Sequence, residues 1–214
     1  MRKLNFLYCA PALLIALVLN GCVSLSESPT PRFYIPDSVV KAQPVEKFKI
    51  NSGTIIAVGP IKIPEYQDRP QMVTKNKDGT FKFAQFDRWG EPLDSVLARL
   101  FSENLAVMLP AASFQSFPCN FAIPLDYQVI VDIIQLDSEL EKDMVVIAQW
   151  SIIDARNRKM LLTKRSYLAK AINPHNYSGL SQALGEACAS LSREIAENLS
   201  NLSKQPGAIE PAAK

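Results

Sequence analysis

Two stretches of the chain repeat apolar residues at helical spacing. The first begins near Pro92, which suits the first position of a helix, and ends before Pro110. Its apolar residues are Leu93, Val96, Leu97, Leu100, Phe101, Leu105 and Met108. The second covers residues 177–199, with the apolar residues Tyr177, Leu180, Leu184, Cys188, Leu191, Ile195 and Leu199. Spacing of three and four residues predicts that each helix buries one face.

Runs of β-branched and alternating apolar residues predict strands around these helices. Strands are expected at residues 33–35, 54–63, 125–133, 144–153 and 160–170. Segments 72–74 and 80–84 flank Asp78-Gly79, whose glycine supplies the positive φ of a hairpin turn. Residues 144–153 are apolar on nearly both faces, as in a central strand. The sequence therefore predicts one α/β domain over residues 32–203, a mixed β-sheet covered on one or both faces by two main helices.

A different pattern precedes this domain. Basic residues open the chain, an apolar run follows from Phe6 to Leu19, and Leu19-Asn20-Gly21-Cys22 closes the run. The run is shorter than the about 20 residues that span a bilayer, so residues 1–21 are interpreted as a signal peptide. Its ending resembles the bacterial lipobox, which implies acyl chains, palmitate included, on Cys22. The alternative is an ordinary signal peptide or a membrane anchor helix.

The ends of the mature chain lack periodicity. Residues 22–31 carry the expected lipidated cysteine and a polar, proline-bearing tether. Residues 23–31 reach about 30 Å when fully extended, which keeps the domain close to its membrane. The signal that retains a lipoprotein in the inner membrane is typically an aspartate directly after the lipidated cysteine, and this chain has Val23 there. The lipobox resemblance therefore implies an outer-membrane anchor with the domain facing the periplasm. Residues 204–214 are expected to form a disordered tail.

The net charge of the chain excludes some classes of binding partner. The formal net charge of the whole chain is +2, and removal of the signal peptide takes away Arg2 and Lys3 but no acidic residue. The mature chain is therefore neutral and has no basic patch of the size that nucleic acid requires. Membrane attachment then depends on acyl chains, and several chains on one protein anchor it stably.

Two cysteines remain in the expected domain, Cys119 and Cys188. An oxidising compartment would allow them to form a disulfide. That bond would close a loop of about 70 residues and contribute on the order of 4 kcal/mol. In the alternative, Cys188 lies on the apolar stripe of the last helix and behaves as a small hydrophobic residue. The sequence leaves both alternatives open.

The chain offers little for catalysis. Its one histidine, His175, lies in a polar loop before the last helix and is interpreted as solvent-facing. The nearby Gly179-Leu180-Ser181 lacks the second glycine of a nucleophile elbow, because Ala183 stands in its place. Three carboxylates in one predicted turn are interpreted as solvated charges: Glu139, Glu141 and Asp143. With no phosphate-binding loop either, we expect no catalytic residue, no metal and no cofactor.

One loop and hairpin have the composition of a protein interface, in which tryptophan, tyrosine and arginine act as anchors. The candidate partner-binding residues are Tyr66, Asp68, Arg69, Pro70, Gln71, Arg88 and Trp89, with the aromatic residues Phe81, Phe83 and Phe86 between them. In the alternative, Phe81 and Phe83 face the core while Asp68 and Arg69 hold the shape of the loop.

Six short motifs resemble one known family, the ABC-type transport auxiliary lipoproteins, which include the lipoprotein of the paraquat-inducible operon. They are Val58-Gly59-Pro60, Pro64-Glu65-Tyr66, Asp68-Arg69-Pro70-Gln71-Met72-Val73-Thr74, Arg88-Trp89-Gly90-Glu91-Pro92-Leu93, Glu103-Asn104-Leu105 and Asp126-Tyr127-Gln128-Val129. The resemblance runs from about residue 33 to residue 202. One departure is Gly90, where alanine is commoner.

The resemblance implies an anticodon-binding-like fold, similar to the amino-terminal domain of TolB. It also implies an outer-membrane lipoprotein that serves an ABC lipid transporter containing mammalian-cell-entry (MCE) domain proteins. The implied partners are the MCE protein, the membrane through the acyl chains, a transported lipid and other copies of the chain. Two other functions stay open: a periplasmic lipid hydrolase, which would need His175 as its base, and a structural envelope lipoprotein.

Overall fold

The structure, a computed structural model, describes residues 29–41, 44–119 and 124–205. The expected signal peptide, Cys22, most of the tether and residues 206–214 of the expected tail lie outside the described residues, so these assignments stay predictions. The elements below belong to the unit that begins at Pro31. Within the described ranges we find no helix that combines the length and the hydrophobicity of a membrane span.

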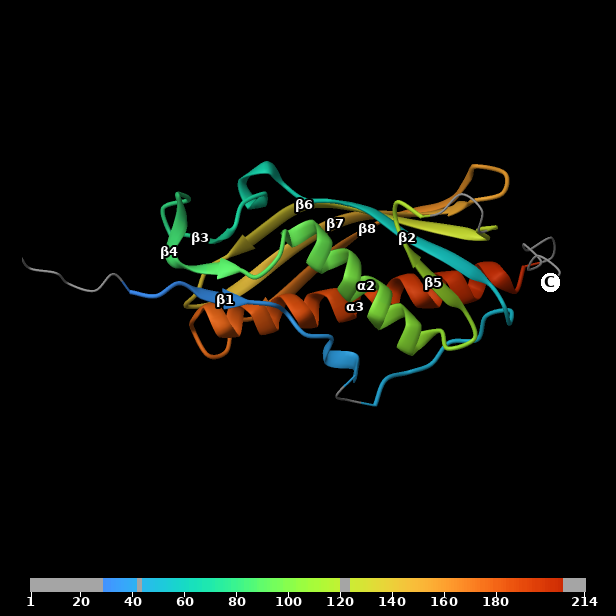
Figure 1. The fold of residues 1–214 in the computed structure, drawn as a ribbon, viewed down its shortest axis with the longest axis horizontal. Helices are drawn as coiled ribbons and strands as arrows, with labels where there is room; N and C mark the ends of the chain where they lie inside the picture. Colours follow the sequence, from blue (N-terminus) through green and yellow to red (C-terminus); the bar gives the residue numbers. More distant parts are fainter. Residues whose placement is uncertain (1–28, 42–43, 120–123, 206–214) are drawn as a thin grey trace, which may run out of the picture. The chain divides into compact units, whose positions relative to one another are not determined.

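The larger of two sheets has five strands (Figure 1). In spatial order they are β5 (Ser113–Ser116), β2 (Ile55–Lys62), β6 (Tyr127–Ser138), β7 (Asp143–Asp154) and β8 (Lys159–Ala171). Strand β2 runs parallel to both of its neighbours, whereas β6, β7 and β8 are antiparallel. The expected mixed sheet is confirmed. Strand β5 was not predicted, because its four residues are too few and too polar to show alternation.

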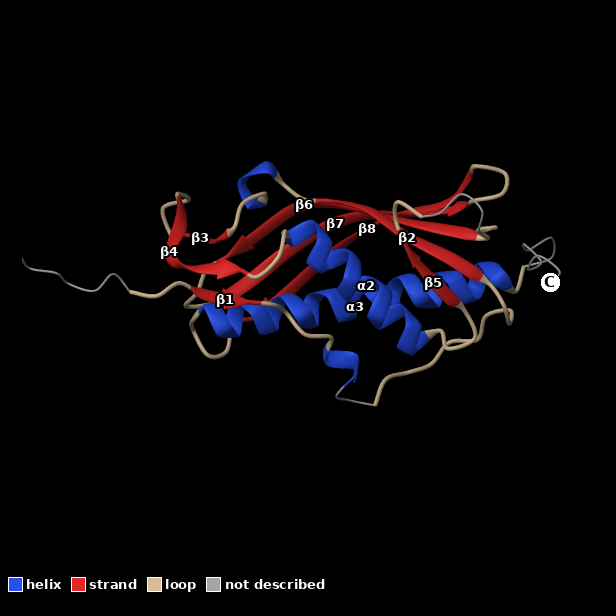
Figure 2. Ribbon diagram, viewed as in Figure 1, coloured by secondary structure: helices blue, strands red, loops and turns tan. Residues whose placement is uncertain are grey.

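Helices α2 (Leu93–Met108) and α3 (Tyr177–Ser203) lie on the same face of this sheet (Figure 2). The first starts one residue later than predicted, since Pro92 is its N-cap. An apolar layer fills the space between helices and sheet, formed by Leu97, Phe101, Ile133, Leu136, Val146, Leu168, Leu184, Ala187, Cys188 and Leu191. The cavity within this layer measures about 10 Å³, the space of roughly one water molecule.

The opposite face of the five-stranded sheet has no α-helix among the described elements. Ile134 is 43% exposed there and Tyr167 is 66% exposed. Val145 and Ile147 of β7 are half-buried on this side. Strand β7 is apolar on both faces because it lies between β6 and β8 in the sheet. The two α-helices cover only one face of that sheet.

A second sheet of three strands holds β1 (Arg32–Tyr34), β4 (Phe81–Trp89) and β3 (Gln71–Lys75), in that order. Strands β3 and β4 form the predicted hairpin, and Gly79 in its turn has a φ of 87°. The expectation of a single sheet was wrong. Strand β4 continues past a bulge to Trp89, and its last residues pair with β1 in parallel. Short 3₁₀ turns, η1 (Val39–Lys41) and η2 (Glu65–Gln67), complete the described elements.

The two cysteines of the domain do not form the disulfide considered above. Both are free in the structure: Cys119 is half-buried and Cys188 is buried. Cys188 lies in the apolar layer under α3, where burial raises the pKa of its thiol to about 12. It packs there as a small hydrophobic residue, which was the other alternative.

Candidate functional site

Two of the motifs, separated in the sequence, lie side by side in the structure. Gln71 pairs with Arg88 in the β3–β4 register, and the backbone N–H of Trp89 donates to the carbonyl oxygen of Pro70 at 2.8 Å. Together they line a surface hollow of about 280 Å³, which we call the motif hollow. It is formed by Asp68, Arg69, Pro70, Trp89, Gly90, Glu91, Pro92 and Leu93. The loop and the strand end that composition marked as an interface are therefore one surface.

The rim and the base of the motif hollow differ in exposure. Asp68, Pro70 and Glu91 are exposed at the rim. Trp89 is only 4% exposed and belongs to the core, so it is not the exposed anchor that composition suggested. Its indole nitrogen is buried without a hydrogen-bond partner. A Cβ added at Gly90 would lie 2.6 Å from the side chain of Ile35. Ile35 therefore occupies the space that the methyl group of an alanine would need.

The outer face of the three-stranded sheet is rich in phenylalanine. In the register, Phe81 lies opposite Lys75 and Phe83 lies opposite Val73. Alternate residues of a strand share a face, so these pairs lie on the same side as the Gln71–Arg88 pair. Phe33 lies opposite Arg88 in β1 and joins them. We call Phe33, Phe81 and Phe83, with Arg69 and Arg88, the aromatic face.

Phe33, Phe81 and Phe83 are 65%, 38% and 48% exposed. The alternative that Phe81 and Phe83 face the core is therefore wrong. The guanidinium carbon of Arg69 lies 4.3 Å from the centroid of the Phe83 ring, a cation–π contact. Tyr66 stacks on Phe81 with ring centroids 4.5 Å apart. The Nε atoms of Arg69 and Arg88 are buried without hydrogen-bond partners.

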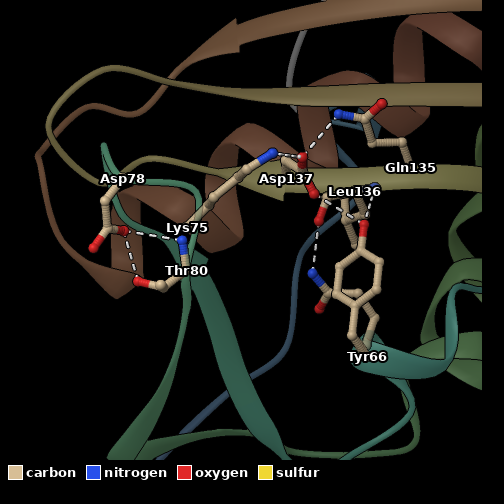
Figure 3. A network of polar contacts seen from close by, with 8 residues as sticks. Tyr66, Lys75, Asp78, Thr80, Gln135, Leu136 and Asp137 are labelled. Atoms are coloured by element: carbon tan, nitrogen blue, oxygen red, sulfur yellow. Dashed lines mark hydrogen bonds and ion pairs between the residues drawn. The ribbon is translucent and has the colours of Figure 1, made fainter.

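A polar network fastens the loop below the aromatic face to the end of β6 (Figure 3). The Tyr66 hydroxyl donates to Oδ1 of Asp137 at 2.9 Å and accepts from the backbone N–H of Leu136 at 3.0 Å. Oδ2 of Asp137 accepts from Nζ of Lys75 at 2.7 Å and from Nε2 of Gln135 at 2.8 Å. Tyr66 thus holds the loop in place, and its ring contacts the aromatic face through Phe81.

The pKa values in this network keep its charges fixed. Burial raises the pKa of Tyr66 to about 12, so its hydroxyl stays protonated and can donate. Burial also acts to raise the pKa of Asp137, but the hydrogen bonds from Lys75, Tyr66 and Gln135 outweigh it and hold that pKa below its usual range. At neutral pH the site therefore contains a neutral Tyr66 and an ionised Asp137.

Sequence reasoning missed this network. Asp137 and Gln135 belong to a strand that looks like any alternating strand, and Tyr66 meets them across about 70 residues of sequence. The buried side-chain amide of Gln67 also joins this junction, where it donates to the Leu136 carbonyl at 2.6 Å. A single sequence carries no signal for such a pairing.

The residues considered for catalysis and metal binding make other contacts in the structure. His175 is exposed in its loop, as predicted, and its Nδ1 lies 2.9 Å from the carbonyl oxygen of Leu140. Glu139 pairs with Lys142 at 2.7 Å and Glu141 with Lys77 at 3.1 Å. Within residues 29–41, 44–119 and 124–205, no three His, Cys, Asp or Glu side chains gather as a metal site.

The family model for the ABC-type transport auxiliary lipoprotein component matches residues 39–196. The chain belongs to this family. As an auxiliary transport lipoprotein, it is a membrane-anchored component of the cell envelope. No curated protein matches its sequence.

Two crystal structures share the fold of this auxiliary lipoprotein. One, of an uncharacterized protein, has 17% identity and a TM-score of 0.63, covering 80% of this chain and 99% of its own. The other, XCC0632 of Xanthomonas campestris, has 11% identity and a TM-score of 0.60, covering 77% of this chain and 92% of its own. At these identities the likeness shows the fold alone, and the similarity to TolB stays a prediction.

Proposed function

We propose that this auxiliary lipoprotein is a non-catalytic docking component of an MCE-type ABC lipid transport system. It is anchored in the outer membrane by acyl chains on Cys22 and faces the periplasm, where its motif hollow binds the MCE protein. The observation that carries the proposal is the convergence of two family motifs on one hollow. The two motifs bring no pair of catalytic groups together in the hollow, which favours a binding role.

The motif hollow suits a protein ligand that brings a basic or a small apolar side chain. Asp68 and Glu91 expose carboxylates at its rim, and prolines at positions 70 and 92 restrict its backbone. A surface that is already rigid loses little conformational entropy on binding. The apolar layer under the helices has only about 10 Å³ of free space, which favours docking over carrying a lipid inside the domain.

Binding to the MCE protein tests the motif hollow directly. We expect the double variant Asp68→Lys and Glu91→Lys to bind about thirtyfold more weakly, the loss of about 2 kcal/mol typical of a hot spot. Glu197→Lys, a charge reversal at an exposed position of α3, is the control and should bind as wild type does. Affinity is measured with the full lipidated protein in detergent. Equal affinities of both variants would place the interface elsewhere.

Lipidation and membrane choice need a separate test. A fatty-acid analogue should label the wild-type protein and leave Cys22→Ser unlabelled. Val23→Asp, which introduces the residue expected for inner-membrane retention, should move the labelled protein to the inner-membrane fraction. A labelled serine variant contradicts the proposed acylation site.

The non-catalytic role predicts that His175→Ala leaves transport intact. Loss of a general base costs about 10²-fold or more in rate, whereas an exposed loop substitution changes stability by about 0.5 kcal/mol at most. Loss of transport at normal abundance and folding would support the hydrolase instead.

A further inference from the structure

We propose that the aromatic face binds the surface of the membrane, with Phe33, Phe81 and Phe83 at the headgroup level and Arg69 and Arg88 bound to lipid phosphates. The occupant is a phospholipid surface that contains anionic lipid. The inference rests on acylation of Cys22, which is part of the proposed function. It assigns this face to the membrane and the adjoining motif hollow, which shares Arg69 with the face, to the MCE protein.

Strand β1 of this sheet directly follows the tether that joins the domain to its membrane anchor. The strand begins at Arg32, and the segment 23–31 that separates it from Cys22 reaches about 30 Å when fully extended. A buried carboxylate fixes β1 on β4: Asp87, 4% exposed, accepts from Nε of Arg32 at 2.8 Å and from the Tyr34 hydroxyl at 2.9 Å. Phe33, between these two residues, faces the opposite side of the sheet and is 65% exposed.

Exposed apolar side chains concentrate near this attachment point. The large exposed apolar residues of the described chain are Phe33, Ile35, Phe81, Phe83, Phe117, Ile134, Met160 and Tyr167. Three of them are the phenylalanines of the aromatic face, brought together by the β1–β4–β3 register. A phenylalanine ring gains free energy by entering the boundary between headgroups and acyl chains. An anchored domain meets that boundary at high effective concentration.

The two arginines add charge complementarity. Neither Arg69 nor Arg88 forms an ion pair with a described residue, and the Nε atom of each is buried without a hydrogen-bond partner. The planar guanidinium donates two parallel hydrogen bonds to phosphate. Asp137, an acid close to this sheet, is already bound by Lys75 and Tyr66. The Nε atoms are enclosed by the protein, so the outer Nη groups of the two guanidiniums are the donors that a lipid phosphate reaches.

Photocrosslinking of the lipidated full chain in vesicles tests the orientation. Benzoylphenylalanine replaces Phe33 or Phe83, and in the control it replaces Tyr167, an aromatic residue of the five-stranded sheet that is 66% exposed. The vesicles contain phosphatidylethanolamine and phosphatidylglycerol. We expect crosslinks to lipid at positions 33 and 83 several times more often than at 167. Equal yields at all three positions would overturn the proposal.

The charge of the face is tested in the same vesicles. Arg69→Gln with Arg88→Gln should lower lipid crosslinking from position 83, because each arginine near an anionic surface contributes about fivefold in binding. The variant should melt as wild type does, which excludes unfolding as the cause. Unchanged crosslinking would show that the arginines do not bind lipid and would overturn their part of the proposal.

Two further readouts separate this inference from the proposed function. The fatty-acid analogue, applied to the same preparation, reports whether the anchor is present. Label on the protein together with background crosslinking at positions 33 and 83 refutes the membrane-facing orientation while the anchor stands. Crosslinks in cells that capture a protein from these positions, and no lipid, would identify the face as a protein interface and equally overturn the proposal.

Discussion

The helix-covered side of the five-stranded sheet and the outer side of the three-stranded sheet follow opposite rules. In the first, Trp150 is 1% exposed and its indole N–H donates to the Ser166 hydroxyl at 2.9 Å. In the second, aromatic rings are exposed, and the Nε atoms of Arg69 and Arg88 have no partner among the residues that the structure describes. Natural proteins pair most buried polar groups, so two unpaired donors beside exposed aromatic rings depart from the rule that the core follows.

The largest test of this contrast compares two aromatic truncations. Trp150→Ala should lower the free energy of unfolding by about 3–5 kcal/mol, because it empties a close-packed core. Phe83→Ala, at a ring 48% exposed, should change it by about 0.5 kcal/mol. Urea denaturation of both variants measures the difference. Comparable losses would mean that the aromatic face is part of the core in solution.

The polar network under the aromatic face should matter less and in a pH-dependent way. Asp137→Asn is expected to cost about 1 kcal/mol at pH 7, since it weakens the bonds from Lys75 and Tyr66. The pKa of Asp137 is lowered by folding, so its contribution is complete above the pKa of the unfolded chain, about 3.9. It is lost as pH falls through the lower folded value.

Denaturation of wild type and Asp137→Asn at several pH values checks that sign. The difference between the two proteins should shrink in acid, below about pH 4. Gln128→Asn, which alters an amide in the same strand away from the network, is the control and should show no such change with pH. A difference that grows in acid would contradict the assigned charge state.

The unpaired indole nitrogen allows a smaller and sharper test. Trp89→Phe keeps most of the packing and removes a buried donor that has no partner in the described part of the chain, so stability should change by less than about 1 kcal/mol. The indole nitrogen is buried, so the MCE protein can accept from it only if the wall of the motif hollow moves on binding; in that case the affinity of Trp89→Phe should fall about fivefold, the contribution of one hydrogen bond. Unchanged affinity would show that the indole nitrogen does not contact the partner.

The smallest effect concerns the free thiols. Cys188 is buried, and burial raises its pKa to about 12, so it should react with maleimide only after unfolding. Cys119, half-buried and outside the apolar layer, should react in the native protein. Peptide mapping after labelling distinguishes the two sites. Slow reaction of both thiols under reducing conditions would indicate that Cys119 is also shielded.

Much of the secondary structure follows from the sequence alone. Apolar spacing predicted α2 and α3 nearly to their ends, alternation predicted β6, β7 and β8, and Asp78-Gly79 predicted the hairpin. These features are local, because the period of a helix or a strand is written in neighbouring residues. The motifs also identified the family, since they depend on residue identity and order and need no coordinates.

Tertiary structure decided what those elements form together. Local periodicity shows that a face is buried but not what covers it, so the sequence predicted one sheet where β1 and the end of β4 build a second. The same limit concealed the burial of Trp89 and the bond from Tyr66 to Asp137. Both depend on contacts between segments far apart in the chain. The aromatic face likewise exists only because strand register places three phenylalanines from two strands on one side.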